Sequence, residues 1–131
     1  MVAVCLPANE RIGPGDSYLV EQLAALPRRP ALVAVATKAD LAPPSRMVEQ
    51  LTDIGGLESR LGVSWEHIIP VCAVERYQLD VLSDSLVGLL PEGPPLYPDG
   101  EITDEPTETL VAELIREAAL DGVRDLSLIH I

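Results

Sequence analysis

The short segment Thr37-Lys38-Ala39-Asp40 has residue types well suited to holding a flat, polar ligand. It follows an apolar run at 31–36, which is typical of a strand buried on both faces of a sheet. The carboxylate of Asp40 could accept two neighbouring N–H groups at once, a bidentate pair that guanine offers and adenine does not. The aliphatic stem of Lys38 could lie along the face of such a base while its ammonium stays in water.

Thr-Lys-x-Asp after a buried strand is one form of the guanine-reading motif of GTP-binding proteins. In open α/β sheets ligands bind beyond the carboxyl ends of the strands, which is where Thr37, Lys38 and Asp40 are expected. Thr37 replaces the commoner Asn, and a hydroxyl cannot make all the hydrogen bonds of an amide. The alternative is that Lys38 and Asp40 are solvated charges in an ordinary loop between a strand and a helix.

A second candidate loop, Val71-Cys72-Ala73-Val74, ends the next predicted strand. GTP-binding proteins place a Ser-Ala-x loop here, and its backbone N–H groups meet the guanine oxygen. Cys72 in place of Ser keeps the backbone contact, which Ala73 would make, but loses a hydroxyl that steadies the loop. The alternative is an ordinary strand end. The spacing from Asp40, one helix and one strand later, favours the binding role.

The sequence lacks the parts that hold phosphates and magnesium in GTP-binding proteins. It contains no G-x-x-x-x-G-K-S/T motif, since Gly13-Pro14-Gly15-Asp16 has no Lys and no following Ser or Thr. Asp53-Ile54-Gly55-Gly56 matches Asp-x-x-Gly by accident, inside a helical pattern. His67 has no second His or Cys nearby, and the acidic run at 99–108 is typical of a solvated linker. We therefore expect this chain to contribute neither a catalytic residue nor a metal ligand.

The hydrophobic pattern of residues 1–91 alternates between short apolar runs and helical spacing. Strands are predicted at 2–6, 31–36 and 67–73, which predicts a parallel sheet in an α/β fold with right-handed crossovers. Asp16 is expected to cap the first helix. The apolar face of that helix would consist of Leu19, Val20, Leu23 and Leu26. The helix expected over 43–62 should be broken or bent at Gly55-Gly56, and another helix is expected over 79–90.

Composition and charge narrow the class of protein. The chain has 131 residues, of which 47% are hydrophobic, enough for one domain with a core. Its net charge of −12 opposes binding of nucleic acid by this part of the protein. It has neither an apolar run long enough for a membrane span nor a signal-peptide pattern, so a cytoplasmic location is expected. Cys5 and Cys72 lie in separate apolar runs and are expected to be buried free thiols.

The order of elements resembles the Era family of bacterial GTPases, which carry a carboxyl-terminal KH domain. The motifs that carry this resemblance, beyond the two loops, are Leu89-Leu90-Pro91-Glu92, Tyr97–Asp104 and Glu113–Glu117. The resemblance implies the carboxyl-terminal half of a P-loop GTPase domain at 1–91, whose phosphate loop and switches are missing. It further implies a linker at 92–106 and the start of a KH domain at 107–125. Residues 126–131 do not follow the family pattern and resemble a non-native tail.

The resemblance also implies what the parent protein does. It would bind GTP and GDP, hydrolyse GTP with Mg²⁺, and bind 16S ribosomal RNA during assembly of the small ribosomal subunit. The RNA contact would be made through the missing part of the KH domain, and Mg²⁺ would be held by residues absent here. This segment alone would be inactive and would hold only the guanine base. The base-binding residues would be Thr37, Lys38, Asp40, Cys72, Ala73 and Val74.

Three points stay open at this level. The family resemblance allows for peripheral association with the cell membrane. The parent could be another small GTPase of the same superfamily, which a different carboxyl-terminal domain would reveal. The chain could also be a non-enzymatic acidic α/β interaction module, in which Lys38 and Asp40 are surface charges.

Overall fold

The computed structural model describes residues 1–94, 103 and 105–120. Within the chain two compact units are distinguished, Met1–Pro91 and Glu92–Ile131, and each is described by itself. Much of the expected linker, residues 95–102 and 104, lies outside the described residues, as does the expected tail at 126–131. The first unit contains β1 (Val2–Pro7), α1 (Pro14–Ala24), β2 (Leu32–Thr37), the 3₁₀ turn η1 (Ala39–Leu41), α2 (Pro44–Leu61), β3 (Trp65–Pro70) and α3 (Leu79–Leu89).

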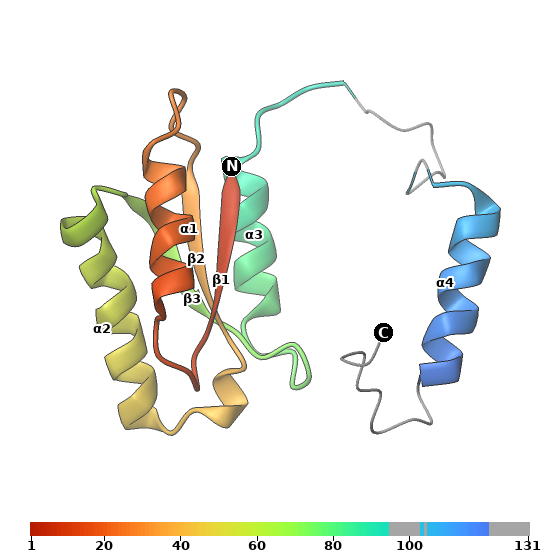
Figure 1. Ribbon diagram of the computed structural model, residues 1–131, viewed down its shortest axis with the longest axis horizontal. Coiled ribbons are helices and arrows are strands. Elements are labelled where there is room, and N and C mark those ends of the chain that lie inside the picture. The colour runs from red at the N-terminus through yellow and green to blue at the C-terminus, as the bar shows by residue number, and fades with distance from the viewer. Residues whose placement is uncertain (95–102, 104, 121–131) are drawn as a thin grey trace. The chain divides into compact units, whose positions relative to one another are not determined.

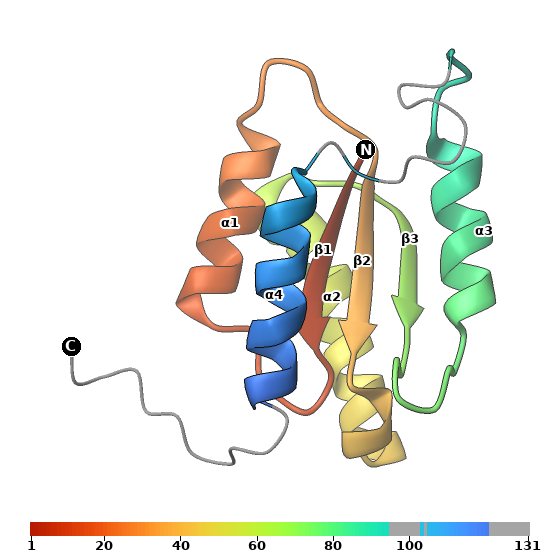
Figure 2. The same ribbon diagram turned by 90° about the vertical axis from the view of Figure 1, so that its right-hand side faces the viewer.

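The three strands form a parallel sheet in the order β1-β2-β3. Val4 pairs with Ala34 and Ala34 with Ile68, so the central strand β2 is hydrogen-bonded on both sides. In Figure 2 the three arrowheads point to the same end of the sheet, as parallel strands joined by helices require. This arrangement confirms the predicted α/β fold.

Helices cover both faces of the sheet (Figure 1), with α1 and α2 on one side and α3 on the other. On the first face Val20, Ile54 and Leu57 are completely buried against the sheet. On the second face the leucines of α3 cover the central and last strands. The residues of that smaller cluster are Val33, Val35, Ile69, Val71, Leu79, Leu82, Leu86 and Leu89.

The expectation that both thiols are buried is wrong for Cys5, which is exposed, whereas Cys72 is buried and both are free. The strand β1 alternates, so that Val4 and Leu6 face α1 and α2 while Ala3 and Cys5 face the opposite side. On that side α3 packs on residues of β2 and β3 and leaves those of β1 uncovered. Cys5 therefore contacts solvent because α3 packs over β2 and β3 and not over β1.

Cys5 should accordingly react with a thiol reagent in the folded chain, and Cys72 should not. We expect one of the two thiols to be modified rapidly under native conditions, and the second only after unfolding. The cysteine reacts as its thiolate, and the reagent must be able to reach that sulfur. Thiol counting with and without denaturant measures this. Two fast-reacting thiols would contradict the burial of Cys72.

The helix α2 runs without interruption from Pro44 to Leu61, so the break predicted at Gly55-Gly56 does not occur. These glycines lie between Ile54 and Leu57, which are both fully buried. The burial of two large side chains, worth about 1.5–3 kcal/mol each, outweighs the cost of about 1 kcal/mol per glycine in a helix. The helix ends instead at Gly62, whose left-handed φ of 70° is the common helix terminator.

Replacing Gly55 or Gly56 with Ala should therefore stabilise the protein. Apart from the two adjacent residues and the nearby backbone of α2 itself, no atom of the described residues lies within 4 Å of the Cβ that either substitution would add. Each Gly→Ala change should raise the free energy of unfolding by about 0.5–1 kcal/mol, because Ala loses less backbone freedom on folding. Gly62→Ala is the matched control: its φ is +70°, so that substitution should destabilise. Chemical denaturation of the three variants compares the signs.

The first helix and the last strand differ in detail from the prediction. Gly13, not Asp16, is the N-cap of α1, because Pro14 begins the helix. Asp16 lies in its first turn and accepts the Gly13 N–H at 2.8 Å. Leu19 is exposed because it is turned away from its buried neighbour Val20, and Leu26, beyond the end of α1, is exposed as well.

The strand β3 begins two residues earlier than predicted, at Trp65, and ends at Pro70 instead of residue 73. Its early end reflects the loop that follows, in which the backbone of Cys72 pairs with that of Tyr77. At its start the Trp65 indole N–H donates to the Ile54 carbonyl at 3.0 Å. This bond satisfies the polar atom of a large side chain that is otherwise buried in the core.

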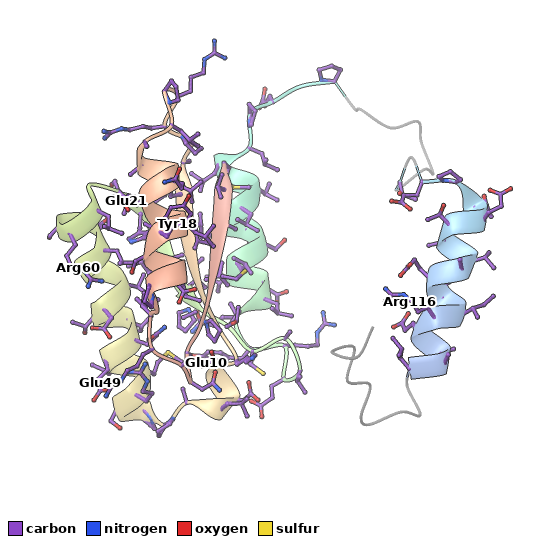
Figure 3. The ribbon with its side chains drawn as sticks, viewed as in Figure 1. Glu10, Tyr18, Glu21, Glu49, Arg60 and Arg116 are labelled. Carbon is purple, nitrogen blue, oxygen red and sulfur yellow. The ribbon has the colours of Figure 1, made fainter. Side chains whose placement is uncertain are left out.

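In the second unit the described part forms α4 (Thr107–Leu120), where a helix was expected. Glu113 accepts hydrogen bonds from Arg116, one turn later, and raises the pKa of that guanidinium. Figure 3 labels Arg116 on this helix. Among the described residues, no helix combines the length and the apolar composition needed to cross a membrane.

Candidate functional site

The two candidate loops lie side by side at the carboxyl edge of the sheet. The Ala39 N–H donates to the Val71 carbonyl at 3.0 Å, which joins the loop after β2 to the loop after β3. Just before, the Val71 N–H donates to the Ala36 carbonyl at 2.8 Å and extends the strand pairing to the edge itself. The position of Asp40 relative to Cys72 is therefore set by backbone hydrogen bonds between neighbouring strands.

Lys38 has a left-handed backbone conformation, with φ 56° and ψ 43°. For a residue with a side chain this conformation costs about 1–2 kcal/mol. Arg76 and Gln78, in the loop after β3, are the other non-glycine residues with positive φ in the described part of the chain. Backbone strain of this kind concentrates at functional sites, where the surrounding structure maintains it. Here one of the three residues lies in the first candidate loop, and the other two lie just beyond the second, between Val74 and α3.

Asp40 lies in the 3₁₀ turn η1 and is exposed, so its carboxylate is accessible. It borders a hollow of about 280 Å³ whose other lining residues include Met47, Cys72, Glu75 and Tyr77. The carboxylates of Asp40 and Glu75 give this hollow hydrogen-bond acceptors, which suit a ligand edge rich in N–H donors. Their negative charge would repel a phosphate group.

The other predicted site residues, Thr37, Lys38, Ala73 and Val74, do not line this hollow. Thr37 is half-buried at the end of β2, and its carbonyl accepts the Ala8 N–H at 2.7 Å. Lys38, Ala73 and Val74 are exposed. The structure thus brings Asp40 and Cys72 to one hollow. In the sequence, Lys38 lies two positions before Asp40, and Ala73 directly follows Cys72.

Cys72 forms hydrogen bonds within its loop through both its sulfur and its backbone. Its sulfur accepts the Glu75 N–H at 3.3 Å, and its backbone exchanges two hydrogen bonds with Tyr77, at 2.9 and 3.2 Å. These bonds close a tight loop over 72–77. A thiol accepts hydrogen bonds weakly, so the backbone pair with Tyr77 is the stronger restraint.

Sequence reasoning missed residues that contact the site directly or through the turn after β1. The ammonium of Lys38 lies 3.9 Å from the carboxylate of Glu10, in the turn after β1. Arg46 and Gln50 of α2 hydrogen-bond to the backbone of the same turn. Figure 3 shows Glu10 and Glu49 at the same end of the sheet. One signal was present: Gln50 is a polar residue on the apolar stripe of α2, at helical spacing from Met47 and Ile54.

Among the described residues no group of three or more His, Cys, Asp or Glu side chains could hold a metal ion. The donors at the hollow, Asp40 and Glu75 with the Cys72 sulfur, therefore do not fit a magnesium centre. The carboxylates at the hollow can accept hydrogen bonds from a polar ligand.

Several curated relatives of this chain are named GTPase Era. The GTPase Era of Nocardioides sp. strain JS614 is 56% identical over 125 residues, and that of Streptomyces coelicolor is 51% identical over 125 residues. The chain is similar in sequence to these GTPase Era proteins. A crystal structure of Aquifex aeolicus Era bound to GDP and aluminium fluoride matches 94% of the chain with a TM-score of 0.75 and 27% identity. No protein-family model matches the chain.

The similarity to Era covers nearly all of this chain but a minor part of each relative. The matched segments make up 95% of the chain, and 40% of the Nocardioides Era and 39% of the Streptomyces Era. The same holds for the Aquifex Era structure, of which 40% is covered. The chain is thus a fragment of an Era-type protein, as the motifs predicted.

Proposed function

We propose that residues 1–91 form the guanine-reading half of an Era-type GTPase domain. The observation that carries this proposal is the direct link between the two candidate loops, from Ala39 to Val71, which places Asp40 and Cys72 on one hollow. The family relationship supports it, since the relatives are named GTPases. A guanine edge placed at Asp40 would present two N–H donors to a carboxylate that takes part in no ion pair among the described residues.

Each site residue has a separate role in this proposal. Asp40 accepts the ring N–H and exocyclic amine of guanine, and Lys38 lays its stem along the base. Thr37 tethers the loop toward the phosphate-binding part of the complete protein. In the second loop the Ala73 N–H meets the guanine oxygen, while Cys72 and Val74 hold that backbone in place. The exposure of Lys38 and Ala73 leaves both free to approach a ligand.

The remaining activities are proposed for the complete protein. We expect GTP hydrolysis to depend on a phosphate loop, switches and Mg²⁺ ligands contributed by other residues, because phosphoryl transfer relies on positioning and charge around the phosphates. The proposed linker at 92–106 leads to α4, which we assign to the start of a KH domain at 107–125. That domain would bind 16S ribosomal RNA on the small ribosomal subunit.

The test is nucleotide selectivity in a chimaeric protein. In it, the matched 125-residue segment of the Nocardioides Era is replaced by the corresponding residues of this chain. Thermal melting with GDP and with ADP, at equal concentrations, measures which nucleotide stabilises the fold through binding. We expect stabilisation by GDP alone. Equal stabilisation by both nucleotides, or by neither in a cooperatively melting chimaera, would reject the proposal and favour an interaction module.

A further inference from the structure

The turn Pro7–Glu10, which follows β1, is held at both ends by side chains of α2. Gln50 Nε2 donates to the Pro7 carbonyl at 3.0 Å, and Arg46 Nη2 donates to the Glu10 carbonyl at 2.6 Å. The same Arg46 nitrogen also donates to Gln50 Oε1 at 3.0 Å, so the two side chains fix each other. We refer to Arg46 and Gln50 as the brace.

The braced turn contacts the guanine-binding loop at two points. The Ala8 N–H donates to the Thr37 carbonyl at 2.7 Å, and Ala8 is fully buried. The Glu10 carboxylate lies 3.9 Å from the Lys38 ammonium, in an exposed pair. An exposed ion pair contributes little by itself, so the backbone bond to Thr37 is the firmer restraint. A shift of the turn would nevertheless move both contacts together.

The burial of Gln50 indicates that its hydrogen bonds matter. It is 1% exposed and is the buried polar residue among those described. Its position on the apolar stripe of α2 would accept Leu or Met, which would avoid the cost of burying an amide. Both ends of this amide are satisfied within the turn and the brace, so the side chain serves as a connection between α2 and the turn.

We propose that Arg46 and Gln50 are positioning residues for guanine recognition, because they hold the Pro7–Glu10 turn against Thr37 and Lys38. This inference rests on the proposed function. The left-handed Lys38 backbone is unfavourable on its own, and a rigid neighbour lowers the cost of ordering it when the base binds. The brace thus stabilises the binding-ready loop without touching the ligand.

The first test needs no nucleotide and uses the full 131-residue chain. Amide hydrogen exchange, read by NMR, reports the bond from Ala8 to Thr37. Arg46→Ala should lower the protection of the Ala8 amide by about tenfold, because it frees the turn locally. Arg60→Ala makes the same change on the exposed far end of α2 and should leave that amide unchanged. Gln50→Leu, which keeps an apolar stripe, should act in the same direction as Arg46→Ala. Equal protection in all variants would overturn the proposal.

The second test measures the affinity for GDP in the chimaera and distinguishes positioning from general stability. Arg46→Ala should weaken GDP binding by about fivefold when Lys38 is present, the loss typical of one hydrogen bond. In a Lys38→Ala background the same change should have a smaller effect, because the contact between Glu10 and Lys38 is already lost and only the bond from Ala8 to Thr37 remains. Equal loss with and without Lys38 would overturn the proposal. A chimaera that does not prefer GDP would reject the proposed function, and Ala8 exchange would still decide whether the brace positions the loop.

Discussion

Asp40→Asn should reverse the nucleotide preference of the chimaera from guanine to xanthine. An Asn amide would present an N–H₂ donor where the carboxylate accepted a bond, and the extra carbonyl of xanthine is the acceptor that matches it. The loss of a bidentate charged contact is worth roughly 1–3 kcal/mol by analogy with base readout in nucleic acids, or about 5- to 150-fold in affinity. Competition of GDP and XDP for the same site measures the change in rank.

The control for this prediction is Asp53→Asn, the same change at an exposed position of α2 remote from the two loops. It should leave the affinities for GDP and XDP unchanged. If Asp40→Asn likewise leaves GDP the preferred nucleotide, then Asp40 does not read the base, and the assignment of Thr37–Asp40 as the guanine-reading loop is wrong.

Ile54→Ala should cause the largest loss of stability among single changes in α2. Ile54 is completely buried between the helix and the sheet, and its carbonyl accepts the indole N–H of Trp65. Removing three methyl or methylene carbons from such a position costs about 2–5 kcal/mol, since transfer and cavity terms add. The fluorescence of Trp65, the single tryptophan, reports unfolding in urea.

Val48→Ala is the matched control, because Val48 lies on the exposed side of the same helix. That change should alter the free energy of unfolding by no more than about 0.5 kcal/mol. Comparable losses at both positions would contradict the packing of α2 against the sheet, and with it the placement of the brace.

The sequence alone determined the elements, their order and the edge at which the two loops meet. Apolar runs at 31–36 and 67–73 and the leucines from Leu79 to Leu89 are local patterns. Each lies where a strand or helix formed, although β3 covers Trp65–Pro70 and not 67–73. Parallel strands joined by helices must end at one edge, so the proximity of Asp40 and Cys72 followed from their positions after β2 and β3. The resemblance to Era likewise depends on residue identity, and the comparisons confirmed that resemblance.

Features that depend on partners far away in the chain became visible only in the folded structure. Gly55-Gly56 stays helical because Ile54 and Leu57 are buried against the sheet, a gain that no local propensity contains. Cys5 is exposed because α3 packs over the other strands. The brace joins α2 to a turn much earlier in the chain, since Gln50 follows Pro7 by 43 residues. Hydrogen bonds between such remote segments leave no periodic trace in the sequence, because they arise only when folding has placed the segments side by side.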